Sequence, residues 1–196
     1  MLILAALLTA GCGGPKFDAA ATAPAEIPVG VLVEREIAGP VFGRPLTGAF
    51  GLAVSAEGFV YCVDRGNDRL IKFRRDLTPV RDAGGTGSAE GLLNRPGFIS
   101  IDNQLNVFVG DERNQRVCRF NSDLVFVDAV DFYDIDDPLK FGEPSGVGLN
   151  VHGEMWVADR QRNRIAIFTT AGQFDRFIGE FGSRGGQVKN PEGIRV

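Results

Sequence analysis

Short apolar runs alternate with polar turns along most of this chain, and the alternation repeats with a fixed period. Three segments align without a gap, and their starts at Ala49, Pro96 and Pro144 lie 47 and 48 residues apart. Each opens on an apolar stretch, crosses a polar turn and continues into a β-branched and aromatic stretch typical of strands. Pro191 follows Pro144 by another 47 residues. The pattern predicts one repeated unit of strands, present three times and begun a fourth time.

Each repeat has room for a fourth strand, predicted at Leu77–Arg81 in the first repeat and at Gln173–Ile178 in the third. Four strands in about 47 residues is the size of one propeller blade, and such a sheet needs neighbours to bury its two faces. The predicted fold class is therefore all-β, a β-propeller of four-stranded antiparallel blades. Three blades cannot close a ring, so we expect an open arc. The blades are predicted at about 49–95, 96–143 and 144–190, with the start of the next at 191–196.

Two charged positions recur in every repeat: an aspartate after the second strand and an arginine five residues later. They are Asp64, Asp111 and Asp159, and Arg69, Arg116 and Arg164. A carboxylate in such a turn can accept N–H bonds from its own turn, and the arginine can bond that carboxylate or a neighbouring blade. A catalytic residue is expected once per site and not once per blade, so we favour a structural role. The alternative is an exposed rim that binds a ligand.

A second polar column and one acidic run are the other candidates for a site. Ser55, Asp102 and Asn150 end the predicted innermost strands, where they could project toward a propeller axis or simply begin a turn. The acidic run is not repeated between copies and lacks the loop pattern of calcium sites. We interpret it as a solvated acidic loop. Its members are Asp128, Asp131, Asp134, Asp136 and Asp137.

The frame of the repeat resembles the NHL repeat. The third copy is the most similar, through Val157-Ala158-Asp159, Asn163-Arg164-Ile165, Phe168 and the segment Gly182–Pro191. The resemblance covers the chain from about Ala49 to its end and implies a propeller of six blades. The second copy departs from the pattern, with Gly110 in place of alanine and a Tyr133–Gly142 connection that is not glycine-rich.

The chain begins with an uncharged apolar run, Leu2–Ala10, that is shorter than the roughly 20 residues needed to span a bilayer. The following Leu8-Thr9-Ala10-Gly11-Cys12 resembles the lipobox of bacterial lipoproteins. We therefore predict a signal peptide at 1–12 ending at a lipidated Cys12, a flexible tether at 13–28 and a partial propeller at 29–196. The alternative is a buried apolar strand. The localisation that follows is extracytoplasmic, in the periplasm or at the cell surface. Val29–Ile37 is the candidate outer strand of a preceding or closing blade.

The remaining reactive side chains do not form a recognisable catalytic or metal-binding pattern. His152 is the single histidine, and Cys62 and Cys118 fall in columns otherwise filled by small hydrophobic residues. We expect both thiols in the core, with a disulfide between adjacent blades as the alternative. The net charge of −4 gives no sign of a nucleic-acid partner.

We predict a non-catalytic scaffold that binds a protein, peptide or glycan. We expect no cofactor, no metal, no nucleic acid, and contact with a membrane only through the lipid anchor. The first alternative is a metal-dependent lactonase- or lyase-like propeller whose axial ligands come from several blades. The second is a structural link in an envelope assembly.

Overall fold

The computed structural model describes residues 2–3, 36–37, 39–132 and 141–196, in two compact units. In the unit Met1–Gly39, strand β1 (Leu2–Ile3) pairs antiparallel with β2 (Glu36–Ile37). The rest of the predicted leader with Cys12, the tether 13–28, and most of Val29–Ile37 lie outside the described residues. No helix among the described residues has the length and apolarity needed to cross a membrane.

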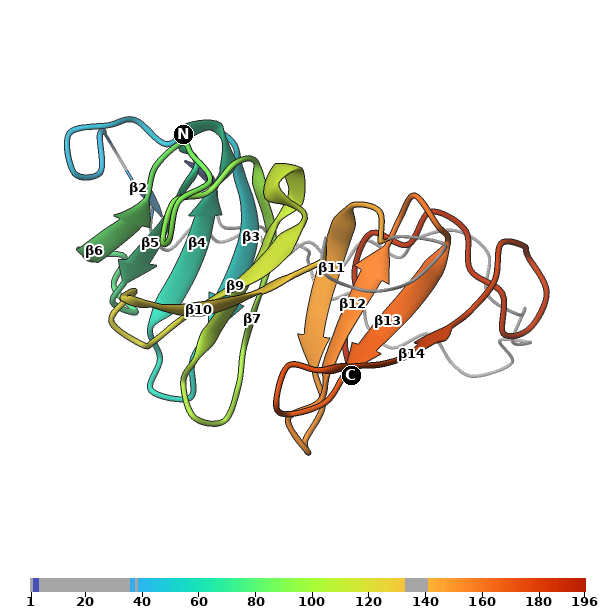
Figure 1. Cartoon of the computed structure of the whole chain (residues 1–196). Coiled ribbons are helices and arrows are strands. Elements are labelled where there is room, and N and C mark those ends of the chain that lie inside the picture. Colours follow the sequence, from blue (N-terminus) through green and yellow to red (C-terminus); the bar gives the residue numbers. More distant parts are fainter. Residues whose placement is uncertain (1, 4–35, 38, 133–140) are drawn as a thin grey trace, which may run out of the picture. The chain divides into compact units, whose positions relative to one another are not determined.

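The unit Pro40–Val196 contains three four-stranded antiparallel sheets, each running in chain order from its first to its fourth strand (Figure 1). The first sheet consists of β3 (Ala49–Val54), β4 (Val60–Asp64), β5 (Arg69–Phe73) and β6 (Pro79–Gly84). The second consists of β7 (Pro96–Ile101), β8 (Val107–Asp111), β9 (Arg116–Phe120) and β10 (Phe126–Asp131). The third consists of β11 (Pro144–Leu149), β12 (Met155–Asp159), β13 (Arg164–Phe168) and β14 (Phe174–Ile178).

The turn between the second and third strands has the same form in each sheet. Short 3-10 helices, η1 (Arg65–Asn67) and η2 (Glu112–Asn114), fill this turn in the first two sheets. The residue that closes the turn has positive φ in every copy, at Asp68, Gln115 and Asn163. Asn and Asp tolerate this left-handed conformation better than other residues with a side chain. The turn brings the recurring aspartate directly opposite the recurring arginine in the register of the sheet.

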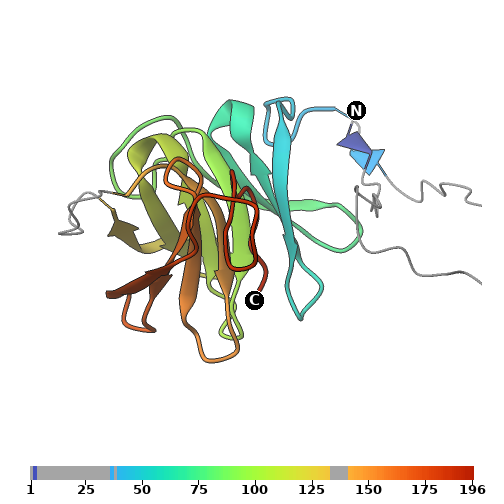
Figure 2. The same cartoon turned by 90° about the vertical axis from the view of Figure 1, so that its right-hand side faces the viewer.

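The first strands of the three sheets lie side by side, β3 next to β7 and β7 next to β11 (Figure 2). Glycine permits the close approach of β3 and β7. A Cβ atom on Gly51 would stand 2.9 Å from the carbonyl oxygen of Gly97 and 3.2 Å from the side chain of Ile99. The first strands are therefore the innermost ones of an open arc of blades, as the repeat predicts.

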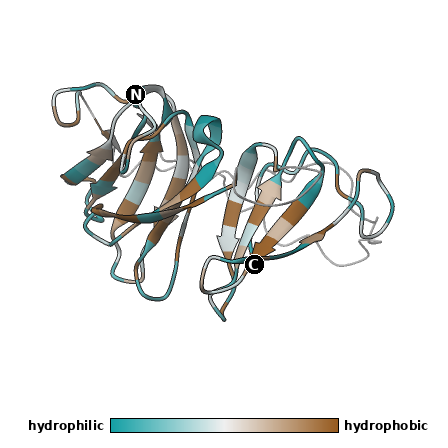
Figure 3. Cartoon of the chain, in the orientation of Figure 1, coloured by the Kyte–Doolittle hydropathy of each residue, from teal (hydrophilic) through white to brown (hydrophobic). Residues whose placement is uncertain are grey.

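Two hydrophobic clusters hold the sheets together, and apolar residues accordingly concentrate on the strands (Figure 3). The cluster between the first and second sheets includes Tyr61, Leu70, Val109 and Phe120. The cluster between the second and third sheets includes Val117, Val147, Val157, Phe132 and Phe168. Both clusters lie between neighbouring sheets, so a face of a sheet is buried where the next sheet covers it. This is the packing expected of propeller blades. The predicted all-β class and the open arc of four-stranded blades are confirmed.

Two details of the strands differ from the predictions. The fourth strand of the first sheet begins at Pro79, because Leu77 has φ 65° and closes the preceding turn through its N–H bond to Arg74. In the second sheet, Asp128 and Asp131 lie on strand β10 and not in a loop. Register explains this strand, since Asp128 pairs with Arg119 on β9 and the next residues continue the ladder. The other predicted members of the acidic run, Asp134, Asp136 and Asp137, lie outside the described residues.

Candidate functional site

The recurring aspartate and arginine form a buried ion pair at one end of each sheet. The arginine Nε lies 2.8 Å from the carboxylate in the first sheet, 2.9 Å in the second and 3.3 Å in the third. All three aspartates are 0% exposed, and the arginines are 0%, 8% and 5% exposed. These side chains therefore do not belong to an exposed rim, because they are covered before a ligand could reach them. The pairs are Asp64–Arg69, Asp111–Arg116 and Asp159–Arg164.

Each aspartate binds the connection that leads into its own sheet. Asp64 Oδ1 accepts the N–H of Thr47 at 2.8 Å, and Asp111 Oδ1 accepts the N–H of Asn94 at 2.7 Å. In the third sheet the N–H of Gly142 donates to Asp159 at 3.1 Å. The partner is thus 17 residues upstream of the aspartate in every sheet.

The predicted N–H bond from the turn to its own carboxylate is present in one of the three sheets. Only Asp159 accepts it, from Arg162 at 3.2 Å. In the first two sheets an asparagine side chain of the turn takes that place, with Asn67 and Asn114 donating to the aspartate at 2.8 Å. An amide side chain can reach the carboxylate while the turn backbone keeps its 3-10 hydrogen bonds.

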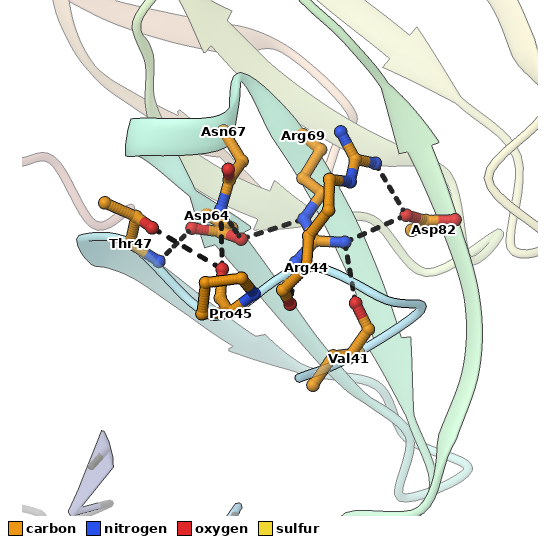
Figure 4. A network of polar contacts seen from close by, with 8 residues as sticks. All are labelled: Val41, Arg44, Pro45, Thr47, Asp64, Asn67, Arg69 and Asp82. Atoms are coloured by element: carbon orange, nitrogen blue, oxygen red, sulfur yellow. Dashed lines mark hydrogen bonds and ion pairs between the residues drawn. The ribbon is translucent and has the colours of Figure 1, made fainter. Parts of the chain in front are cut away.

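The arginine binds carbonyl groups of the same connection. Arg69 Nη1 donates to Val41 O at 3.0 Å and Nη2 donates to Arg44 O at 3.2 Å (Figure 4). Its Nη1 also reaches Asp82 on β6 at 3.1 Å. Arg116 Nη2 similarly donates to the carbonyls of the next connection, at 3.1 and 2.9 Å. We call the buried pair with its bonded connection the linker clamp.

The connection between the first and second sheets is held from both sides. On the side of the first sheet, Asp68 accepts bonds from Thr86 Oγ1 and from the N–H of Arg95, both at 2.7 Å. Asn163 occupies the same position in the third sheet and accepts the N–H of Asn190 at 2.8 Å. The residue that closes the turn in left-handed conformation thus also fixes the outgoing connection.

Burial dominates the electrostatics of the clamp. It raises the pKa of Asp111 and of Asp159 above the ordinary value, and hydrogen bonds to the carboxylates oppose this shift only in part. For Asp111 the opposing donors are Asn114, the N–H of Asn94 and Arg116. A carboxylate that is buried and bonded in this way is poorly placed to act as a general base or to bind a metal ion.

The column Ser55, Asp102 and Asn150 serves the hairpin turns between the first and second strands. Ser55 Oγ accepts the N–H of Phe59 at 3.2 Å, and Asp102 Oδ1 accepts two turn N–H groups at 2.8 Å. Asn150 Oδ1 accepts the N–H groups of His152 and Glu154, both at 2.9 Å. These oxygens act as turn acceptors, which is one of the two alternatives that the sequence left open. Among the described residues, no group of three or more His, Cys, Asp or Glu is placed to hold a metal ion.

Charged residues at the position directly after the recurring aspartate form further ion pairs, which the sequence analysis missed. Arg65 forms an ion pair with the buried Glu112 of the second sheet, which also lies 3.4 Å from Arg95 Nε. Arg160 of the third sheet bonds Glu143 at 3.1 Å, and this bond raises the pKa of Arg160. The alternation of Arg65, Glu112 and Arg160 at one repeat position is the sequence feature that could have indicated these ion pairs.

Cys62 and Cys118 are free thiols in the core, as their columns predict, and no disulfide joins them. Desolvation by burial, with smaller repulsion from the nearby aspartate, raises the pKa of each thiol to about 12. These thiols are therefore uncharged at neutral pH and behave as small hydrophobic residues.

Comparison with known proteins supports the fold. No family model matches the chain. Protein brain tumor of Drosophila melanogaster is 40% identical over 57 residues, which is 29% of this chain and 6% of that protein.

Solved structures of similar fold include two lyases and a synthase. Virginiamycin B lyase from Staphylococcus aureus has a TM-score of 0.55 at 17% identity, over 72% of this chain and 44% of that one. A streptogramin B lyase has a TM-score of 0.59 at 12% identity, over 77% and 45%. The hydrazine synthase of Kuenenia stuttgartiensis has a TM-score of 0.58 at 13% identity, over 84% and 42%. The chain spans less than half the length of these structures. Together with its three four-stranded sheets, these similarities show that the chain has the β-propeller fold.

Proposed function

We propose that this chain is an NHL-type propeller that acts as a non-catalytic binding scaffold for a protein, peptide or glycan. The observation that supports this function is the structural role of the recurring aspartates and arginines. In every described blade they are buried and bonded to blade connections, so their recurrence serves assembly of the array. The local similarity to protein brain tumor and the NHL-like frame of the third blade agree with this family.

The binding surface of such a scaffold is the end of the array that carries the hairpin turns. Equivalent turns differ in chemistry from blade to blade, with Ala56-Glu57 in the first, Asn103-Gln104 in the second and Val151-His152 in the third. All six residues are exposed, and Val151 is 82% exposed. Rigid sheets carrying variable loops are a common basis for recognition of macromolecules.

The location that we propose is extracytoplasmic, with the propeller held at the membrane by a lipid on Cys12. The short apolar leader and the small residues before this cysteine support it. The test is expression of the full chain in a bacterium with labelled fatty acid. The wild-type protein takes up label and sediments with membranes, and the Cys12→Ser variant does neither. Unchanged fractionation of the variant would contradict the anchor.

Partner binding is tested on peptide and glycan arrays with the purified full chain. We expect binding that survives EDTA and falls when Val151 and Gln104 are both changed to Ser on the hairpin end. A double change at the opposite end, Arg113→Ser with Arg162→Ser, is the matched control and leaves binding unchanged. Turnover of a lactone or cyclic ester that is lost with EDTA would instead establish the alternative, a metal-dependent lyase- or lactonase-like enzyme.

A further inference from the structure

Polar side chains close the outer part of the interface between the first and second sheets. Lys72 on β5 extends to the turn between β9 and β10, where its Nζ lies 3.1 Å from the carboxylate of Asp123. Beside it, the hydroxyl of Tyr61 donates to the carbonyl of Ser122 at 2.8 Å. Lys72 is only 5% exposed and Tyr61 only 1%. This interface is therefore sealed by an ion pair and a hydrogen bond from one sheet to the next.

The interface between the second and third sheets has different residues at the same repeat positions. Arg119 stands in the place of Lys72, Phe108 in the place of Tyr61, and Ala171 in the place of Asp123. Neither the tyrosine hydroxyl nor the aspartate carboxylate is present, so both cross-sheet contacts are lost. Arg119 instead donates from Nε and Nη2 to Asp128 of its own sheet, at 2.9 Å from Nε.

In the interface between the second and third sheets, a groove of about 440 Å³ lies at the position that is sealed in the first interface. Phe108, Val130, Leu149 and Met155 form its apolar wall, and the turn residues Thr169–Gly172 line its other side. A second hollow of about 290 Å³ adjoins it, with Phe108, Arg119, Leu149, Gly153 and Thr170 lining both. The volume is within the roughly 300–1,000 Å³ of small-molecule sites.

The groove presents one cation that an incoming group can reach. The side chain of Arg119 is 35% exposed, and no described residue accepts a hydrogen bond from its Nη1. The ion pair with Asp128 is itself exposed, and such pairs contribute little to stability, so it does not prevent a second acceptor. A guanidinium has five donors, enough for two carboxylates. Asp131 also lines the groove, and its cross-strand partner is Arg116, the cation of the second linker clamp.

We propose that this groove binds a small amphipathic carboxylic acid. Its carboxylate pairs with Arg119 and replaces the carboxylate that Asp123 supplies to Lys72 in the first interface. Its apolar body packs against Phe108, Leu149 and Met155. The two interfaces thus place a cation at the same repeat position. Lys72 pairs across the interface with Asp123, whereas Arg119 pairs with Asp128 of its own sheet and takes the ligand carboxylate as a second acceptor. None of the six exposed turn residues proposed for partner binding lines this groove, although Gln104, Val151 and His152 line the adjoining hollow.

The probe is 4-phenylbutyrate, compared with 4-phenylbutanol and 4-phenylbutylamine, which share its apolar body and differ in charge. Calorimetry on the purified full chain measures the affinity of each. We expect the carboxylate to bind most tightly and the amine most weakly. Arg119→Gln lowers the affinity for the carboxylate by roughly tenfold or more. The affinity for the alcohol stays unchanged, which also shows that the fold is intact. Arg75→Gln, on an exposed turn of the first sheet, is the control and changes neither.

A second variant tests the geometry by sealing the groove. Phe108→Tyr, Arg119→Lys and Ala171→Asp together install the residues of the first interface, and we expect binding of the acid and of the alcohol to be lost. Equal affinity for all three probes, no binding at millimolar concentration, or unchanged affinity in either variant would each overturn this site.

Discussion

Replacing Arg69 by Met removes the centre of the first linker clamp while keeping most of the aliphatic volume of the side chain. Arg69 is 0% exposed and donates to four acceptors, the carboxylates of Asp64 and Asp82 and the carbonyls of Val41 and Arg44. Asp64 is also 0% exposed, so the variant leaves a buried carboxylate without its cation. We therefore expect Arg69→Met to be among the most destabilising single substitutions in the blades.

The magnitude follows from the geometry of the pair. Removing one partner of a buried ion pair costs about 3–5 kcal/mol, because the other charge stays buried and unpaired. Loss of the donors to two carbonyls adds about 1 kcal/mol for each group that water cannot reach. The nearby Arg44–Asp82 pair provides the contrast, since the side chain of Arg44 is 47% exposed and such pairs are worth less than about 1 kcal/mol. Arg69→Met should therefore cost more than Arg44→Met by at least about 4 kcal/mol.

Urea denaturation followed by circular dichroism measures both variants. The total stability of a domain is about 5–15 kcal/mol, so the first variant loses a large share of it and the second keeps nearly all. Adding Asp64→Asn to Arg69→Met removes the stranded charge but keeps an acceptor for the N–H of Thr47, and it should restore part of the loss. Equal midpoints for Arg69→Met and Arg44→Met would refute the clamp as a buried, strongly coupled unit.

Three further predictions concern the packing of the sheets. Gly51→Ala should destabilise the chain by about 1–3 kcal/mol in urea, because its Cβ would meet a carbonyl oxygen at 2.9 Å, whereas Gly185→Ala has open space and should change stability by less than about 0.5 kcal/mol. Tyr61→Phe should cost about 1 kcal/mol through its lost cross-sheet hydrogen bond, and a cost near zero would show that the seal of the first interface does not depend on the hydroxyl. Burial raises the pKa of the Cys62 thiol to about 12 in the folded chain, against 9.0 ordinarily, so above pH 9 the unfolded state loses this proton first. The free energy of unfolding should therefore fall by about 1.4 kcal/mol per pH unit from pH 9 toward pH 12. Urea midpoints at several pH values should decline less steeply for Cys62→Val, and identical slopes would contradict the burial of the thiol.

The period and the residue types of the strands were sufficient to predict the blades. Apolar positions recur at the same offsets, so the starts at Ala49, Pro96 and Pro144 coincide with the first strands of the three sheets. The fourth strands were harder to locate, because they are more exposed and their composition varies. Strand β10 contains two aspartates, and only its pairing with β9 identifies it as a strand.

The site was only partly accessible to sequence reasoning. The spacing of five residues correctly placed Asp64 opposite Arg69, because a tight turn fixes local geometry. The bond from Thr47 to Asp64 depends on how a connection folds back over 17 residues, which residue types do not encode. The groove was missed for a different reason. It is produced by residues that lack a polar group, Phe108 and Ala171, and it becomes visible only when the two interfaces are compared in three dimensions.

The linker clamp also determines how the array responds to heat or force. The connection between the first two sheets is bonded to Asp68 on one side and to Asp111 and Arg116 on the other. Detaching one sheet therefore strips hydrogen bonds from the buried charges of the next, so the free-energy cost of a boundary between folded and unfolded blades is high. In a one-dimensional array, a high boundary cost suppresses partly unfolded states. The blades should consequently melt together in a single sharp transition, and the hinge angle between neighbours should be stiff.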